Sequence, residues 1–124
     1  PHDVAAALTR LSTPHTLLVV DCLTLWLTRW TMPVGVEAMS FEQKQALALD
    51  WQAQAAMFLE AVRKSPGPVV LVGNEIGLGV IPMGREVRAF VDALGTLNQQ
   101  VAQLCPRVTL MAAGLPLILK EPRP

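Results

Sequence analysis

The sequence predicts an α/β fold with a mostly parallel sheet and flanking helices. Short apolar runs typical of buried strands alternate with longer segments whose apolar residues recur at helical spacing. The run VVLV at residues 69–72 is followed at once by polar residues and glycines, in the order GNEIGLG. Polar groups just past the carboxyl end of a parallel strand lie where open α/β sheets bind ligands. With 124 residues, the chain is long enough for one domain with a real core.

The amino-terminal part predicts a helix, a strand and a second helix. Apolar residues at i, i+4 and i+7 indicate an amphipathic helix within residues 1–11. The run TLLVVD at residues 16–21 indicates a buried strand that ends in a carboxylate. Residues 22–30 again show helical spacing, and residues 31–39, which contain proline and glycine, are expected to form an irregular loop.

The next segment predicts a long helix that leads into the central strand. Ser40 and Gln43 form a capping box, in which the hydroxyl and the amide each satisfy a free backbone N–H. Apolar residues then recur along one face until the sequence SPGP at residues 65–68 ends the helix. The strand at residues 69–72 follows directly.

The carboxyl-terminal part predicts one more helix and two strands. A long apolar stripe over residues 85–104 indicates a helix, which Cys105-Pro106 ends. Residues 108–113 are expected to form a third strand, residues 114–116 a turn, and residues 117–119 a short edge strand.

Three main strands make a small sheet for a fold of this kind, since sheets typically have about 5–6 strands. The chain begins with Pro1 rather than Met, and its hydrophobic content is 52% with only 16% charged residues. These observations suggest that strands are absent on the amino-terminal side, and that residues 1–124 are the carboxyl-terminal part of one domain.

Composition excludes several classes of partner and site. The formal net charge is zero, so nothing points to nucleic acid or to a membrane surface. No apolar run reaches the roughly 18–20 residues of a membrane span, and no signal peptide is recognisable. Cys22 and Cys105 are far apart and are expected to be free, buried thiols in a reducing cytosol. Without paired-His or CxxC spacing, no protein-ligated metal site is expected.

Two carboxylates are the main candidates for chemistry. Asp21 and Glu75 both follow predicted strands, and in a parallel sheet both would lie at the same edge. A carboxylate there can accept hydrogen bonds from a ribose or a base, or hold Mg²⁺ beside a phosphate. The alternatives are that Asp21 caps the next helix and that the segment after residue 72 is an ordinary glycine-rich loop.

The other polar and aromatic candidates have simpler interpretations. The histidines have no partner at catalytic spacing, the tryptophans occur at core spacing, and two arginines lie on the first turns of a helix. We therefore expect surface histidines, packed tryptophans and solvated arginines at these positions: His2, His15, Trp26, Trp30, Trp51, Arg85 and Arg88.

The chain contains no G-x-x-x-x-G-K-[ST] phosphate loop. The glycines Gly77 and Gly79 do not form one, because no Lys and Ser/Thr follow them. The residues alone thus indicate part of a nucleotide-type α/β domain.

Four blocks of the sequence, in the right order, nevertheless resemble one family. VVLVGNEIGLGVIP at residues 69–82 resembles the diagnostic strand and loop of the bifunctional adenosylcobinamide kinase/adenosylcobinamide-phosphate guanylyltransferase (CobU/CobP) family. The other three blocks similar to that family are LLVVDCLTLWLTRW, FVDALGTLNQQVA and VTLMAAGLPLILK, at residues 17–30, 90–102 and 108–120.

The resemblance implies a fold, a reaction and a set of cofactors. The fold would be a P-loop, RecA-like sheet with its amino-terminal strand or strands missing here. Family members phosphorylate adenosylcobinamide and then transfer GMP from GTP to give adenosyl-GDP-cobinamide, through a guanylylated histidine. The implied cofactors are GTP, ATP and Mg²⁺. The phosphate loop and that histidine lie upstream of the matched region, so the resemblance places no catalytic residue in this chain.

The resemblance also implies site residues. Asp21 matches the family's acidic residue that contacts the guanine nucleotide, where a carboxylate can accept hydrogen bonds from guanine N1–H and N2–H₂. Asn74 and Glu75 match the family block at the edge of the site. Glu75 is expected either to act through Mg²⁺ or to order the loop.

Further expectations follow from the same resemblance. The complete protein is expected to be a cytoplasmic homo-oligomer, with a trimer among its expected forms. Residues 1–124 alone are expected to be inactive and to fold poorly, because removing the first strand would expose one edge of the sheet and both apolar faces beside it. The alternatives are a non-catalytic remnant or interaction module of P-loop fold, or another small P-loop kinase, against which the block NEIGLGVIP argues.

Overall fold

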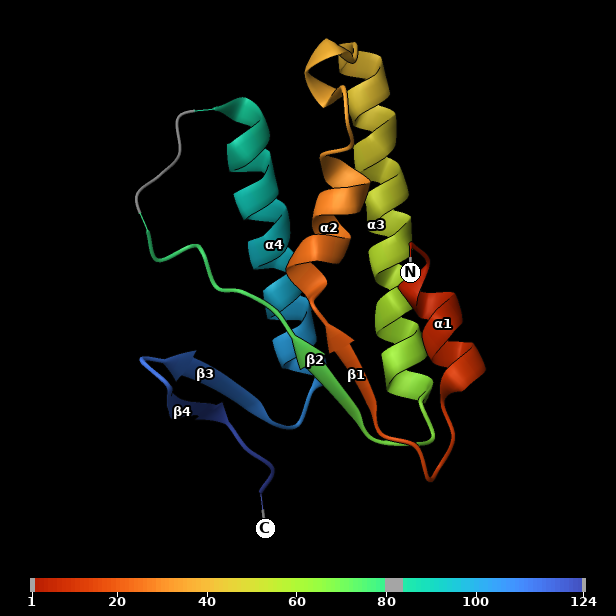
Figure 1. Ribbon diagram of the computed structural model, residues 1–124, viewed down its shortest axis with the longest axis vertical. Coiled ribbons are helices and arrows are strands. Elements are labelled where there is room, and N and C mark those ends of the chain that lie inside the picture. Colours follow the sequence, from red (N-terminus) through yellow and green to blue (C-terminus); the bar gives the residue numbers. More distant parts are fainter. Residues whose placement is uncertain (1, 80–83, 124) are drawn as a thin grey trace.

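The computed structural model describes residues 2–79 and 84–123 of the chain (Figure 1). It shows a mixed α/β arrangement, in which four α-helices accompany two short two-stranded sheets. In chain order the elements are α1 Val4–Leu11, β1 Leu18–Asp21, α2 Leu23–Thr31, the 3-10 helix η1 Val36–Ala38, α3 Phe41–Lys64, β2 Val69–Val72, α4 Arg85–Leu104, β3 Val108–Ala112 and β4 Leu115–Lys120.

The predicted helices are confirmed, and α1 and α3 begin with side-chain caps. At α1, Asp3 Oδ1 accepts a hydrogen bond from the Ala6 N–H at 3.0 Å. At α3 both bonds of the capping box form, with Ser40 Oγ accepting from the Gln43 N–H at 3.1 Å and Gln43 Oε1 accepting from the Ser40 N–H at 2.9 Å. Together these bonds satisfy backbone donors that a helix leaves free in its first turn.

Strands β1 and β2 form the predicted parallel pair, in the register Leu18↔Val69 to Asp21↔Val72. Alternate residues face opposite sides, as the two-residue period of a strand requires. One set packs against the helical core and the other set is exposed. The packed set is Leu18, Val20, Val69 and Leu71, and the exposed apolar set is Val19, Val70 and Val72.

All four helices contribute to a single core on one side of this pair. Val19, Val70 and Val72, which we call the open face, are 57%, 47% and 40% exposed. The expectation that both faces of the sheet would be exposed is therefore wrong, because α1 to α4 cover one of them. The residues on the covered face are partly buried, whereas those of the open face are exposed.

The expectation of one mostly parallel sheet is only half correct. Strand β3 pairs with β4 as an antiparallel hairpin and does not join β1 and β2 (Figure 1). Its turn consists of Ala113 and Gly114, which have φ angles of 53° and 74°. Two central residues with positive φ are typical of the tight turns that join neighbouring strands. Such a turn brings β4 next to β3 at little loop-closure cost, which explains why the local partner is the one observed.

The hairpin also corrects the predicted turn at residues 114–116, because β4 already begins at Leu115. Its last residue, Lys120, joins the hairpin to α4. The Lys120 Nζ donates to the carbonyl oxygens of Ala102 and Gln103 at 2.8 and 3.2 Å. A cation at this position also complements the negative end of the helix dipole.

The core forms where α2, α3 and α4 meet. Phe58 and Leu27 are fully buried, and Trp26 contacts both Phe58 and Trp51, with ring centroids 4.8 Å apart in each pair. The edge-on and tilted ring arrangements are those that aromatic quadrupoles favour. The predicted packing role of Trp26 and Trp51 is confirmed, since they are only 4% and 6% exposed.

One glycine is required by a close approach of two chain segments. A Cβ placed on Gly67 would lie 2.0 Å from the Thr13 carbonyl oxygen and 2.8 Å from that of Thr16. We expect Gly67→Ala to lower the free energy of unfolding by about 1–3 kcal/mol, because the backbone must move to relieve the overlap.

Gly95→Ala is the matched control: nothing lies within 4 Å of its Cβ position in α4. It is expected to raise stability by about 0.5–1 kcal/mol, because alanine favours a helix interior over glycine. Urea unfolding of both variants measures the difference, and equal stabilities would contradict the close approach.

Candidate functional site

The candidate site lies where β1 and β2 end. Asp21 is the last residue of β1 and pairs with Val72, the last residue of β2. The parallel arrangement thus brings the ends of both strands to one edge, as predicted. Asp21 belongs to the exposed set of the alternation, so its carboxylate lies on the side of the open face.

The structure speaks against the alternative that Asp21 caps the following helix. The N-cap residue of α2 is Cys22, and no side-chain cap bond forms there. Asp21 therefore lies one residue before the cap position and remains exposed at the end of its strand.

Asn74 and Glu75 follow β2 in an exposed loop. The Glu75 Oε1 accepts a hydrogen bond from the Gly77 N–H at 2.7 Å, within the same loop. This contact corresponds to the loop-ordering role that the sequence left as one of two alternatives. Both main-chain groups of Asn74 are bound: its N–H donates to Thr24 Oγ1 at 3.0 Å, and its carbonyl oxygen accepts from Asn98 Nδ2 at 3.0 Å.

Thr24 and Asn98 are the residues at this edge that sequence reasoning missed. Thr24 is the second residue of α2, and Asn98 lies on α4 next to the buried Leu97. A signal for Asn98 was present, because it is a polar residue four positions after Leu94 on an otherwise apolar stripe. Thr24 gave no comparable signal, since a polar residue in the first turn of a helix is common.

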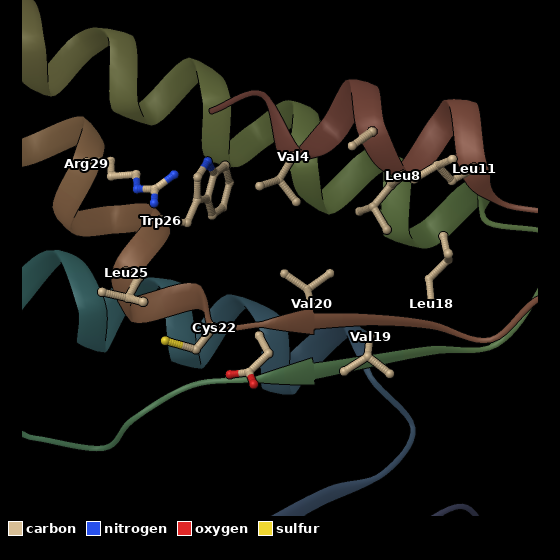
Figure 2. Close-up of a pocket in the computed structure, with 12 residues that line it drawn as sticks. Val4, Leu8, Leu11, Leu18, Val19, Val20, Cys22, Leu25, Trp26 and Arg29 are labelled. Carbon is tan, nitrogen blue, oxygen red and sulfur yellow. The ribbon is translucent and has the colours of Figure 1, made fainter. Parts of the chain in front are cut away.

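A hollow of about 320 Å³ lies beside β1, between that strand, α1 and α2. Figure 2 shows Leu8 and Leu11 of α1 facing Leu18 of β1, with Trp26 and Arg29 of α2 at one end. Asp21 and Cys22 complete this end, whereas Asn74 and Glu75 are not among the lining residues. The hollow is mainly apolar, so it does not resemble a phosphate or nucleotide cradle, and the three candidate residues share an edge rather than a pocket.

The described residues provide no protein-ligated metal centre. Within residues 2–79 and 84–123 no group of three or more His, Cys, Asp or Glu side chains could hold a metal ion. Mg²⁺ is commonly bound by one or two carboxylates together with substrate phosphates, which demands less of the protein. Asp21 and Glu75 are exposed carboxylates, Asp21 at the end of β1 and Glu75 in the loop that follows β2.

The simpler interpretations of the remaining candidates are largely confirmed. His2 stacks on Trp30 with centroids 4.0 Å apart, His15 is exposed, and Arg85 and Arg88 are exposed on α4. Cys22 and Cys105 are free thiols, as predicted. The prediction that they are buried is wrong, because both are only partly buried. Burial raises the pKa of the Cys105 thiol, which disfavours the reactive thiolate form.

Two further observations concern the end of the family block and the helices. The last residues of the block VVLVGNEIGLGVIP, Val80 to Pro82, lie outside the described residues. Across the parts of the chain that are described, no helix has the combination of length and hydropathy needed to cross a membrane.

Comparisons with known proteins identify relatives over nearly all of the chain. The sequence profile of the cobinamide kinase/cobinamide phosphate guanyltransferase family (CobU) matches residues 1–119. The chain is 40% identical over 120 residues to the bifunctional adenosylcobalamin biosynthesis protein CobP of Pseudomonas aeruginosa, covering 97% of this chain and 62% of that protein. It is 31% identical over 108 residues to the CobU protein of Escherichia coli and 30% identical over 110 residues to that of Salmonella typhimurium, covering 86% of this chain and 60% of each relative.

These matches confirm the resemblance that the four sequence blocks indicated, and they speak against the alternative of a different small P-loop kinase. The chain spans about 60% of the length of the curated relatives that it matches. The sequence profile and the identities agree on one conclusion: the chain belongs to the cobinamide kinase/cobinamide phosphate guanyltransferase family.

Proposed function

We propose that the complete protein acts in cobalamin biosynthesis. It would phosphorylate adenosylcobinamide at a hydroxyl group with a nucleoside triphosphate and then transfer GMP from GTP to the new phosphate, giving adenosyl-GDP-cobinamide. The observation that supports this most is that Asp21 and the segment leading to Asn74 and Glu75 lie at the carboxyl ends of two paired parallel strands, in a chain that belongs to the family. The finer fold that we propose for the complete protein is a P-loop, RecA-like sheet.

In this proposal Asp21 reads the guanine base. A carboxylate accepts two parallel hydrogen bonds from guanine N1–H and N2–H₂, and adenine offers no such pair of donors at that edge. The geometry suits this role, since the side chain is exposed at the end of its strand and does not cap α2. Binding of the base there would extend over the ends of β1 and β2.

Asn74 and Glu75 form the part of the site next to the base. One carboxylate oxygen of Glu75 accepts from the Gly77 N–H, so this residue first orders its own loop. GTP or ATP would supply the transferred group. Mg²⁺ bound with the nucleotide would neutralise part of the phosphate charge. The Asn74 side chain can donate and accept at the same edge, which suits a phosphate or ribose oxygen.

We further propose that the complete protein is a cytoplasmic homo-oligomer, with a trimer as one candidate state. Residues 1–124 alone are proposed to be inactive, because no phosphate-loop motif occurs in this sequence. Turnover of GTP with adenosylcobinamide by the purified 124-residue chain would contradict that statement.

The test of the proposed function is a product assay on the complete gene product. The purified protein is incubated with adenosylcobinamide, Mg²⁺ and ATP, without and with GTP. The corrinoid products are separated and identified by mass spectrometry. We expect a phosphorylated intermediate with ATP alone and a guanylylated product once GTP is present. Recovery of unchanged adenosylcobinamide from a folded, nucleotide-binding protein would contradict the proposal.

The open face favours a second candidate function, a non-catalytic module that assembles with a partner. Its exposed residues Val19, Val70 and Val72 form an apolar surface that a partner strand or helix could cover. The same product assay separates the two candidates, because such a module would form a complex without converting adenosylcobinamide.

A further inference from the structure

Side chains from two helices hold the main chain of Asn74. The Asn74 N–H donates to Thr24 Oγ1 on α2, and the Asn74 carbonyl oxygen accepts from Asn98 Nδ2 on α4, each at 3.0 Å. We call these three residues the Asn74 clamp. Because both backbone groups of one residue are bound, the peptide groups on either side of Asn74 are fixed in position and direction.

The two side chains of the clamp start from rigid positions. Thr24 follows Leu23, which is 2% exposed, and Asn98 follows Leu97, which is 1% exposed. Leu23 and Leu97 belong to the same hydrophobic core. The clamp therefore connects the exposed loop after β2 to helix positions next to the hydrophobic core.

Gly73, the residue before Asn74, also lies close to both helices. A Cβ placed on Gly73 would lie 3.6 Å from Asn98 Oδ1 and 3.7 Å from Leu23 Cβ, which are ordinary contact distances. The segment that enters the clamp thus has neighbours from both α2 and α4. The loop itself is exposed, so water could satisfy the same backbone groups, and the two bonds fix position rather than compensate for burial.

We propose that Thr24 and Asn98 are positioning residues, which hold the Asn74 main chain so that the Asn74 and Glu75 side chains stand at the sheet edge next to Asp21. This inference rests on the proposed function of that edge. Neither residue needs to touch the nucleotide, because each acts through the backbone of Asn74. A misplacement of reacting groups by about 1 Å can lower a rate 100-fold, so loosening this loop is expected to be measurable.

The test replaces each side chain of the clamp in the complete gene product. Thr24→Val removes the hydroxyl with little change of shape, and Asn98→Leu removes the amide from the other helix. We expect each change to lower kcat/KM for guanylylated product about tenfold. Thr24→Ser keeps the hydroxyl and is expected to restore the rate. Thr28→Val is the matched control, because the Thr28 hydroxyl on the same helix donates only within α2, to the Thr24 carbonyl oxygen.

Amide hydrogen exchange of Asn74, followed by NMR, gives a readout that does not depend on turnover. We expect the Asn74 N–H to exchange faster in Thr24→Val, and to remain protected in Thr24→Ser and Thr28→Val. An Asn74 amide that exchanges equally fast with and without the Thr24 hydroxyl would overturn the proposal. So would unchanged kcat/KM in the Thr24→Val/Asn98→Leu double variant.

The two readouts separate this inference from the proposed function. If the unaltered protein converts no adenosylcobinamide, the proposed function fails, and the exchange experiment still decides whether the clamp holds Asn74. If the unaltered protein is active and the clamp variants have the same kcat/KM and the same amide exchange, the proposed function stands and the positioning role is wrong.

Discussion

Replacing Phe58 by alanine is expected to lower the free energy of unfolding by about 3–5 kcal/mol, the range for a fully buried phenylalanine. The Phe58 side chain is 0% exposed, and it contacts Trp26 at the centre of the helical core. Removing its ring would take away apolar burial and leave a cavity beside Trp26 that the packed helices can close only in part. Because natural domains are stable by about 5–15 kcal/mol, this change would remove a large share of the total.

Phe41→Ala provides the matched control, because Phe41 is 78% exposed at the start of the same helix. The same chemical change there is expected to alter stability by no more than about 0.5 kcal/mol. Urea unfolding followed by tryptophan fluorescence measures both variants, since Trp26 and Trp51 lie in the affected core. Similar losses of stability in the two variants would mean that α3 does not pack as described.

Asp21→Asn is expected to weaken GTP binding by the complete gene product about 10- to 100-fold, since a bidentate pair to a base is worth about 1–3 kcal/mol. Asparagine replaces one acceptor oxygen of the carboxylate by an amide donor, which would face a guanine donor and form no bond with it. The affinity for ATP is expected to change little. The expected result is therefore a loss of discrimination between GTP and ATP rather than a loss of folding.

The control for this experiment is Asp92→Asn, which makes the same change at an exposed position on α4. Isothermal titration calorimetry of the unaltered protein and both variants, with GTP and with ATP, gives the six affinities needed. An equal loss of affinity for both nucleotides in Asp21→Asn would contradict base recognition. It would instead indicate that this carboxylate acts on a part common to both nucleotides.

Local patterns in the sequence were enough to predict most elements and the main candidate residue. The capping box at Ser40, the apolar stripe of α4 and the strand that ends at Asp21 all depend on neighbours within one or two turns. Such features are determined by short-range geometry and by the period of apolar residues, which a sequence displays directly. The edge shared by β1 and β2 could also be predicted, because parallel strands end on the same side.

What the sequence did not reveal depends on contacts between distant segments. The Asn74 clamp joins residues 24, 74 and 98, and no periodicity marks a hydroxyl or an amide that will meet a backbone group 24 or 50 positions away. The pairing of β3 with β4 was also missed, because strand composition does not specify a partner and the positive φ of Ala113 is not evident from its residue type. The single covered face of β1 and β2 likewise follows from where four helices pack.

The most direct test of the proposed nucleotide site is a crystal structure of the complete gene product with a non-hydrolysable GTP analogue and Mg²⁺. We expect the guanine N1 and N2 atoms to lie within about 3.2 Å of the Asp21 carboxylate oxygens, with the Asn74–Glu75 loop beside the ribose or phosphates. Guanine bound elsewhere, with Asp21 in contact only with solvent, would contradict the central claim that the carboxyl ends of β1 and β2 form the guanine site.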